Sequence, residues 1–162
     1  MAACAPGYRK PNAAERGFGR VLAFLVRRGL VRGHFHVLEV RGRKTGRLLS
    51  LPVDALDLNG RRFLVCARGE TQWARNARAA GEITLVQGSE RRRYHARELP
   101  VASRAPILQE YLDRFAAEVQ RFFPVAKGSA EAAFADIAAN YPVFELVPVD
   151  GAAEQDQQRM PR

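Results

Sequence analysis

The sequence is poor in cysteine and contains no long hydrophobic run. Its two cysteines, Cys4 and Cys66, are too few for a disulfide framework and lack the spacing of a zinc site, so we expect a reducing, cytoplasmic environment. No apolar stretch approaches the roughly 20 residues that a membrane-spanning helix needs. The N-terminus also lacks the apolar run and cleavage site of a signal peptide. The sequence therefore predicts a cytoplasmic protein without a transmembrane segment.

Lysine is scarce as well, although the chain is strongly basic. Only Lys10, Lys44 and Lys127 are lysines among the 26 basic residues, and the formal net charge is +9. Such a charge favours an acidic partner, which could be nucleic acid, an anionic membrane surface or a phosphorylated small molecule. Because an arginine bias can also follow from genome composition, the places where the charges cluster are more informative than their total.

The pattern along the chain indicates one domain, at residues 12–150, between a flexible lead-in at 1–11 and a disordered tail at 151–162. Helices are expected from Asn12, after Thr71, near Ser103 and after Ser129, and the expected strands are 34–41, 47–58, 61–67, 82–87, 90–100 and 143–149. Asn59-Gly60 predicts a tight hairpin, and so does Gly88-Ser89. Strands joined mostly by hairpins predict a mainly β (α+β) fold, a small antiparallel barrel with flanking helices.

The expected N-terminal helix is basic and amphipathic. Its apolar side chains fall on one face, and these are Phe18, Val21, Leu22, Leu25 and Val26. A basic amphipathic helix can make peripheral contact with an anionic membrane. With so few large apolar residues, packing against the core of the domain is the preferred interpretation.

A basic loop at residues 42–47, Gly-Arg-Lys-Thr-Gly-Arg, precedes the second expected strand. It is not a Walker A motif, because its Lys-Thr pair precedes the second glycine and a strand follows it. The glycines let backbone N–H groups turn toward an anion, Thr45 offers a hydroxyl, and the charge comes from Arg43, Lys44 and Arg47. The loop is suited to a phosphate or carboxylate, although on this motif alone a solvated basic hairpin turn is the preferred interpretation.

A second element, residues 67–82, places Trp73 and Asn76 three residues apart on a short helix. Residues with this spacing share one helical face, where they could form the wall of a site for a flat aromatic ligand. The alternative is that Trp73 belongs to the core, the usual position of a lone tryptophan.

Taken in order, these elements resemble the deazaflavin-dependent nitroreductase family, split-barrel oxidoreductases that use coenzyme F-420. The similarity lies in the Gly-Arg-Lys-Thr-Gly loop, the proline of the next strand, the Arg68-Gly69 pair and the Trp-x-x-Asn helix, over about residues 12–100. The resemblance implies a six-stranded antiparallel split β-barrel of the FMN-binding type. It also implies hydride transfer from reduced F-420 to a planar electrophile such as a nitroaromatic or a quinone.

The resemblance further implies which residues contact the coenzyme. The loop would hold the phosphate and the acidic tail, the following strand and Ala67-Arg68 would border the ring, and the Trp-x-x-Asn helix would close the site. The implied contacts are Gly42, Arg43, Lys44, Thr45, Gly46, Arg47, Pro52, Val53, Ala67, Arg68, Trp73 and Asn76. No catalytic residue and no metal ligand is predicted, and Tyr141 is the candidate for a tyrosine on the substrate side.

The sequence departs from the family pattern at two places. Leu49 stands where many members have an arginine, so either Arg47 substitutes or the tail is held more weakly. Only Glu70, Thr71 and Gln72 separate the Arg-Gly pair from Trp73, where many relatives have a longer glycine-rich stretch, and this affects the expected shape of the pocket.

Other functions remain open on the sequence alone. The protein could bind FMN instead of F-420, or carry the deazaflavin without turnover. It could also be a basic module for nucleic acid or anionic lipid, since arginines 91–93 stand beside Tyr94. We prefer to interpret that run as a solvated edge strand protected by its charge, and we expect an enzyme without a nucleic-acid partner. A homodimer that pairs through the sheet is consistent with the resemblance.

Overall fold

The computed structural model describes residues 10–31 and 33–149. Cys4, most of the expected lead-in and the whole expected tail lie outside these residues. Within them, no helix combines the length and the apolar composition needed to cross a membrane.

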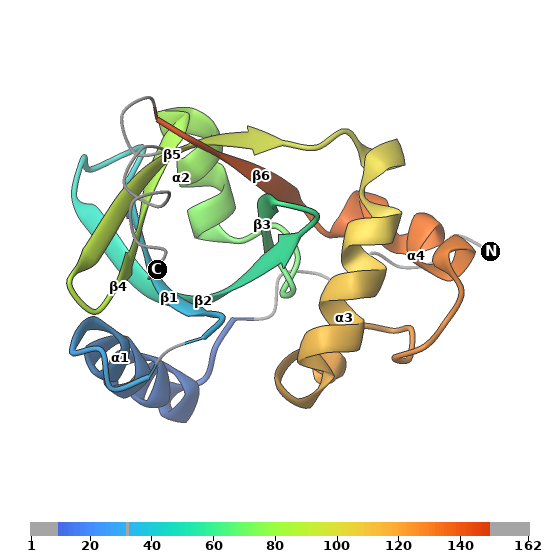
Figure 1. The fold of residues 1–162 in the computed structure, drawn as a ribbon, viewed down its shortest axis with the longest axis horizontal. Helices are drawn as coiled ribbons and strands as arrows, with labels where there is room; N and C mark the ends of the chain where they lie inside the picture. The colour runs from blue at the N-terminus through green and yellow to red at the C-terminus, as the bar shows by residue number, and fades with distance from the viewer. Residues whose placement is uncertain (1–9, 32, 150–162) are drawn as a thin grey trace, which may run out of the picture.

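Six antiparallel strands close into a barrel in the order β1-β2-β3-β6-β5-β4 (Figure 1). Their bounds are β1 Phe35–Arg41, β2 Leu48–Leu58, β3 Arg61–Val65, β4 Glu82–Gln87, β5 Glu90–Glu98 and β6 Val143–Pro148. The expected barrel and all six expected strands are confirmed, with ends that shift by one or two residues. The expected edge at arginines 91–93 holds in part: among the described strands Arg91 and Arg92 pair with β4 alone, while the ladder between β5 and β6 begins at Tyr94.

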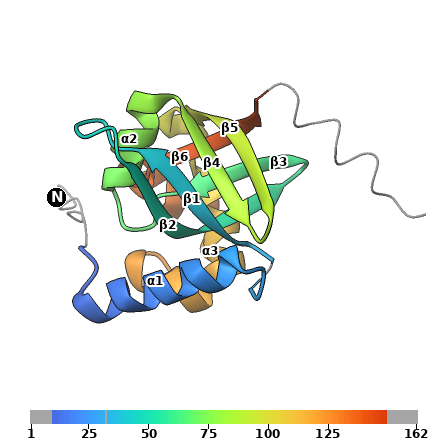
Figure 2. The same ribbon diagram turned by 90° about the vertical axis from the view of Figure 1, so that its left-hand side faces the viewer.

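Within residues 10–31 and 33–149, four α-helices and three short 3₁₀ turns surround the barrel. The helices are α1 Ala13–Arg27, α2 Gln72–Ala80, α3 Ala105–Val119 and α4 Glu131–Ile137, and the turns are Val101–Ser103, Gln120–Phe122 and Ala138–Asn140. Figures 1 and 2 show α1 along the outside of β1 and β2, with α3 next to it and α4 beyond α3. The third helix begins at Ala105 because a 3₁₀ turn occupies the residues around Ser103.

The turn and cap residues adopt the conformations that the sequence predicts. Asn59 and Gly60 have φ values of 52° and 73°, as a tight hairpin requires. The Asn12 side chain accepts a hydrogen bond from the Glu15 N–H, and Thr71 accepts one from Ala74. Helices α1 and α2, which border the candidate site, therefore begin where the sequence indicates.

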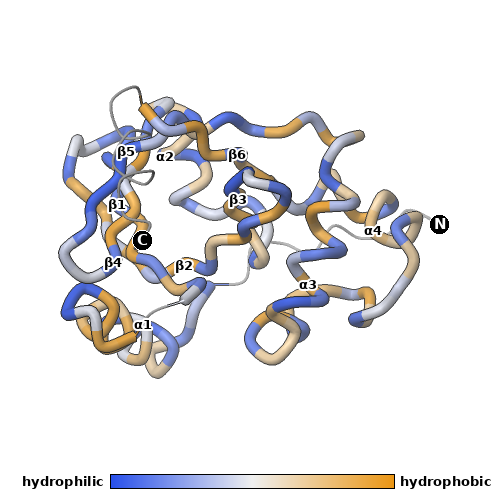
Figure 3. Tube along the Cα trace, viewed as in Figure 1, coloured by the Kyte–Doolittle hydropathy of each residue, from blue (hydrophilic) through white to orange (hydrophobic). Residues whose placement is uncertain are grey.

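The N-terminal helix packs on the barrel mainly through its C-terminal part. Val26 is buried against Val37 and Val86, whereas Phe18 is 70% and Val21 58% exposed. The expected packing of the whole apolar face is therefore wrong for the first half of α1. The helix faces Pro52 of β2 at Gly19 and packs on β1 and β4 in its last turns. Figure 3 shows hydrophobic residues along much of its length.

The barrel is split along the first half of β2. Pairing between β2 and β3 begins at Ala55 and Leu64, so residues 48–54 are paired with β1 alone. The Ala55 N–H donates to the His34 carbonyl (2.9 Å), and the alternation of an antiparallel ladder then turns the backbone polar groups of Ser50, Pro52 and Asp54 toward the split. Proline is tolerated at such an unpaired edge because it has no N–H to donate.

Candidate cofactor and substrate site

A cavity of about 860 Å³ lies against the split. Its walls come from α1, the open half of β2, residues 65–73, α3 and the following 3₁₀ turn. Binding sites for small molecules and cofactors span roughly 300–1,000 Å³. The cavity is therefore large enough for a polycyclic cofactor with a substrate beside it.

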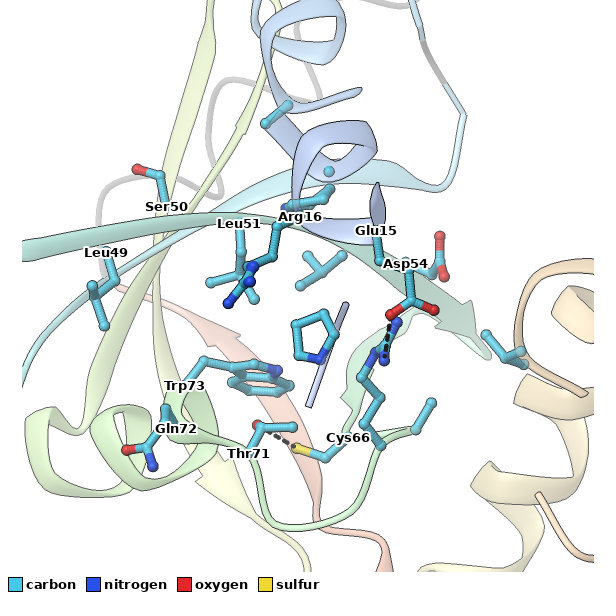
Figure 4. A pocket seen from close by; sticks show the side chains of 18 of the residues that line it. Glu15, Arg16, Leu49, Ser50, Leu51, Asp54, Cys66, Thr71, Gln72 and Trp73 are labelled. Atoms are coloured by element: carbon cyan, nitrogen blue, oxygen red, sulfur yellow. Dashed lines mark hydrogen bonds and ion pairs between the residues drawn. The ribbon is translucent and has the colours of Figure 1, made fainter. Parts of the chain in front are cut away.

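Five of the twelve expected coenzyme contacts line this cavity, and they are Pro52, Val53, Ala67, Arg68 and Trp73. Trp73 is buried and forms part of the wall (Figure 4). Its ring also packs on Phe144 inside the barrel, with the centroids 5.6 Å apart. Trp73 is therefore a core residue that also lines the cavity, and its contact with a ligand stays a prediction.

The other seven expected contacts, loop 42–47 and Asn76, do not line the cavity. They lie next to it, because the Arg43 guanidinium donates to Asn76 Oδ1 (2.9 Å) and to Gln72 Oε1 (3.1 Å), and Gln72 is a lining residue. The backbone N–H of Arg43 also donates to Asn76 Oδ1 (3.1 Å). The basic loop is thereby fastened to α2 beside the cavity.

Besides that of Arg43, three further backbone N–H groups of the basic loop already have acceptors. Gly42 donates to the Arg47 carbonyl and Gly46 to the Gly42 carbonyl, both at 2.8 Å, while the Arg47 N–H donates to Thr45 Oγ1 at 3.3 Å. The side chains of Lys44 and Arg47 are exposed and form no ion pair with any described residue. In this conformation the loop offers an anion mainly side-chain charge.

Three arginines of α1 line the cavity, and the sequence reasoning did not identify them as site residues. One of them, Arg27, is ion-paired with Glu39 at 2.6 Å. Arg16 and Arg20 are four residues apart, so they lie on one face of the helix. Figure 4 shows Arg16 reaching from α1 into the cavity. Leu49, at the position where relatives have an arginine, lines the opposite wall as an apolar residue. Positive charge therefore reaches the cavity from α1.

A carboxylic acid lies within the largely apolar wall. Asp54 lines the cavity next to Val53, and its side chain is only 14% exposed. Burial raises the pKa of Asp54 to about 6, although the nearby His34 and the hydroxyl of Tyr111 act in the opposite direction. Asp54 Oδ1 and His34 Nε2 are 3.6 Å apart, and neither buried atom has a hydrogen-bond partner among the described residues. An aspartate in an apolar strand next to a proline was the available signal in the sequence.

A second polar group closes the other side of the cavity. Arg68 Nη1 is 3.4 Å from Glu15 Oε2, which joins the β3–α2 loop to α1. The Arg68 guanidinium also lies over the ring of Phe122, 4.2 Å from its centroid. These contacts hold α1 and the turn after α3 across the mouth of the site.

The candidate substrate-side tyrosine, Tyr141, does not line the cavity. It is buried, its hydroxyl donates to the Phe122 carbonyl (2.8 Å), and its ring stacks on Phe123 with centroids 4.6 Å apart. Tyr111 of α3 lines the cavity instead.

Cys66 also lines the cavity, but burial raises the pKa of its thiol well above the ordinary value, so the thiol stays neutral and unreactive.

Comparison with known proteins identifies the family. A model of the F420H2-dependent quinone reductase family matches residues 23–124, well over half of the chain. A search of curated proteins finds no match. Among solved structures, an F420-H2 dependent reductase (FDR-A) is 19% identical, with a TM-score of 0.48, over 70% of this chain and 93% of that one.

Two further solved structures resemble the fold somewhat more closely. One, described as a domain-swapped dimer, is 18% identical with a TM-score of 0.51 and covers 82% of this chain and 92% of its own. The other, a protein of unknown function from Agrobacterium tumefaciens strain C58, is 15% identical with a TM-score of 0.53, over 88% of this chain and 58% of that one. At these identities they support the barrel fold alone. The match of the family model carries the assignment: the chain belongs to the F420H2-dependent quinone reductases, and is thus an oxidoreductase that uses coenzyme F-420.

Proposed function

We propose that the protein transfers a hydride from reduced coenzyme F-420 to a quinone that binds in the cavity between α1, β2 and α3. The observation that carries the proposal is this 860 Å³ cavity on the split edge of a barrel that belongs to the quinone reductase family. Its aromatic and aliphatic wall residues suit flat ring systems, and the arginines that also line it suit an anionic group.

The residues of the split fit the ring of the coenzyme. Pro52 and Val53 lie on an edge without a neighbouring strand, and the backbone groups directed toward the cavity there are the Pro52 carbonyl and the N–H and C=O groups of Ser50 and Asp54. Such groups can pair with the polar edge of a flat heterocycle, while Trp73 limits the access of water. The bound coenzyme supplies the hydride, and the protein holds and orients it.

The charged residues fit the anionic part of the coenzyme. We propose that Arg43, Lys44, Thr45 and Gly46 contact its phosphate, as the family resemblance implies, and that Arg47 lies beside them. In this chain Arg16 and Arg20 bring further positive charge to the same cavity. These two arginines are the better candidates to compensate for Leu49, because they line the cavity and Arg47 does not.

Four finer points belong to the same proposal. A nitroaromatic is the alternative acceptor, since it is also flat and accepts a hydride. The exposed Phe18, Val21 and Leu30 near arginines of α1 support peripheral contact with an anionic membrane. A homodimer and a cytoplasmic location remain proposals, the first supported only by the solved relative described as a domain-swapped dimer.

The test is an anaerobic assay of the purified protein with reduced F-420 and either menadione or a nitroaromatic, followed by the absorbance of the oxidised coenzyme. We expect saturable oxidation of the coenzyme with menadione and a lower kcat/KM with the nitroaromatic. Fluorescence titration with oxidised F-420 measures binding separately. Tight binding without acceptor-dependent turnover would indicate a carrier and overturn the proposed function, and tighter binding of FMN than of F-420 would overturn the assignment of the coenzyme to this cavity.

A further inference from the structure

The reduction of a quinone requires a proton at the acceptor as well as a hydride, and the cavity contains few groups that could deliver it. Its titratable side chains, arginines aside, are Glu15, Asp54, Cys66 and Tyr111 among the described residues. The surroundings of each group determine whether it can donate a proton.

Three of the four are unsuited to giving up a proton near neutral pH. Glu15 holds a lowered pKa through the backbone hydrogen bond at Asn12 and nearby arginines, so it is already ionised. Burial raises the pKa of Cys66 and of Tyr111 well above the ordinary values, so both retain their protons. Asp54 remains.

Asp54 is positioned on the cavity by the strand that forms the split. It follows Pro52 and Val53 directly, and it is the last residue of β2 before pairing with β3 begins. Its backbone is therefore fixed by β1 on one side while the side chain borders the cavity. Figure 4 shows Asp54 toward the end of β2 that is nearest α3.

The groups that face Asp54 come from two elements besides its own strand. His34, just before β1, lies 3.6 Å from Asp54 Oδ1. Tyr111 and Glu118 of α3 also act on the carboxyl, Tyr111 by lowering its pKa as a hydrogen-bond donor and Glu118 by raising it through its charge. Burial outweighs the others and keeps part of the Asp54 population protonated near pH 6.

Resting on the proposed function, we propose that Asp54 is the general acid that protonates the quinone oxygen during reduction. The acceptor takes two electrons as a hydride from reduced F-420 and becomes the monoanion of a hydroquinone. The O–H bond of Asp54 then breaks as the new O–H bond of the hydroquinone forms. The Asp54 carboxylate then regains a proton from solvent. Oxidation of the coenzyme releases one proton to solvent, so the overall reaction transfers two electrons and two protons to the quinone.

The experiment compares Asp54→Asn with Asp57→Asn, a matched change on the same strand outside the cavity. Two acceptors separate the steps: menadione needs a proton, whereas the cation N-methylphenazinium becomes neutral on accepting a hydride and needs none. With menadione we expect the single-turnover rate of the wild type to fall above about pH 6, and that of Asp54→Asn to be at least ~10-fold lower at pH 5.5 and independent of pH. With N-methylphenazinium the three proteins should be alike.

Two measurements do not depend on turnover. Fluorescence titration should give the same F-420 affinity for wild type and Asp54→Asn, and infrared titration should show a carboxyl band with a midpoint near pH 6 that is missing only in Asp54→Asn. An unchanged menadione rate and pH profile in Asp54→Asn would overturn this inference while leaving the proposed function intact. A wild-type protein that transfers hydride to N-methylphenazinium but never to menadione would overturn both.

Discussion

Arg43 and Asn76 join the two sequence elements from which the site was predicted. The Asn76 side-chain oxygen accepts hydrogen bonds from both the backbone N–H and the guanidinium of Arg43, at 3.1 and 2.9 Å. Asn76 is buried and does not line the cavity, so it shapes the site through the loop that it holds. The Trp-x-x-Asn motif thus combines a wall residue with a residue that positions the basic loop.

The first prediction follows from this connection. Asn76→Ala removes both acceptor interactions, each worth about 1 kcal/mol, so loop 42–47 gains freedom that the coenzyme must restrict on binding. We expect the Kd for F-420 to rise roughly 5- to 30-fold in a fluorescence titration. Arg75→Ala, an exposed change on the same helix, is the control. Equal affinities for these two variants would show that the loop does not contact the coenzyme.

The second prediction concerns the arginines that enter from α1. Arg16→Gln combined with Arg20→Gln lowers the positive charge of the cavity by two, and the phosphate and carboxylates of F-420 should then bind more weakly. At low ionic strength we expect a Kd about 10-fold higher than that of the wild type, and a smaller difference in 0.5 M salt because salt screens exposed charges. Arg28→Gln combined with Lys127→Gln removes the same two charges outside the cavity and controls for long-range effects. An Arg16→Gln/Arg20→Gln variant that binds like this control would leave Arg47 as the candidate for the tail.

Local features of this fold could be predicted from the sequence because local interactions determine them. Asn12 and Thr71 cap helices through their own side chains, and Asn59-Gly60 supplies the positive φ values of a hairpin. The ordered motifs then located the five predicted residues that line the cavity.

The features that were missed depend on how distant segments pack. Periodicity gives the apolar face of α1 but not the fraction of the helix that reaches the barrel, and so Phe18 was expected to pack where it is exposed. Arg16 and Arg20 became site residues only because α1 spans the split. The environment of Asp54 likewise comes from His34 and α3, which are remote in sequence.

The third prediction addresses the exposed half of α1. Phe18 and Val21 are largely exposed on a helix that also carries arginines, a combination that favours an anionic lipid surface. We expect the protein to sediment with phosphatidylglycerol vesicles and not with phosphatidylcholine vesicles. Phe18→Ser with Val21→Ser should weaken this association at least ~10-fold without altering F-420 binding. Val147→Ser, on β6, is the control, and vesicle binding that survives the double change would exclude α1 as the contact.

The fourth prediction concerns stability in acid. Glu145 of β6 pairs with Arg61 of β3 and Arg97 of β5, each at 2.7 Å, and these bonds lower the pKa of Glu145 to about 2. A carboxyl group whose pKa is lowered by folding stabilises the folded protein at pH values above its pKa in the unfolded state. This stabilisation is lost as the pH falls from about 4.5 to 2. Glu145→Gln should therefore reduce the free energy of unfolding by about 1–2 kcal/mol at pH 7 and by little at pH 2.5. Urea unfolding at both pH values measures this, with Glu131→Gln as an exposed control. An equal loss in the free energy of unfolding at pH 7 and pH 2.5 would contradict the prediction.

The fifth prediction has the opposite sign and concerns Asp54. Burial raises its pKa to about 6 from an ordinary 3.8, so the folded state binds more protons than the unfolded state between these values. The associated stability is complete below pH 3.8 and is lost as the pH rises through 6, at a cost of about 2 kcal/mol once partial contact with solvent is considered.

Asp54→Asn avoids that cost because its amide does not ionise. The variant should match the wild type at pH 4 and unfold several degrees higher at pH 8, measured by thermal unfolding across this range. Asp57→Asn supplies the contrast on the same strand: the bond to Arg62 lowers the pKa of Asp57, so its replacement should destabilise the protein at pH 8. An Asp54→Asn variant less stable than the wild type at pH 8 would contradict this prediction. It would mean that favourable interactions of the ionised carboxylate outweigh its burial penalty, and Asp54 would then be ionised near neutral pH and unable to donate a proton.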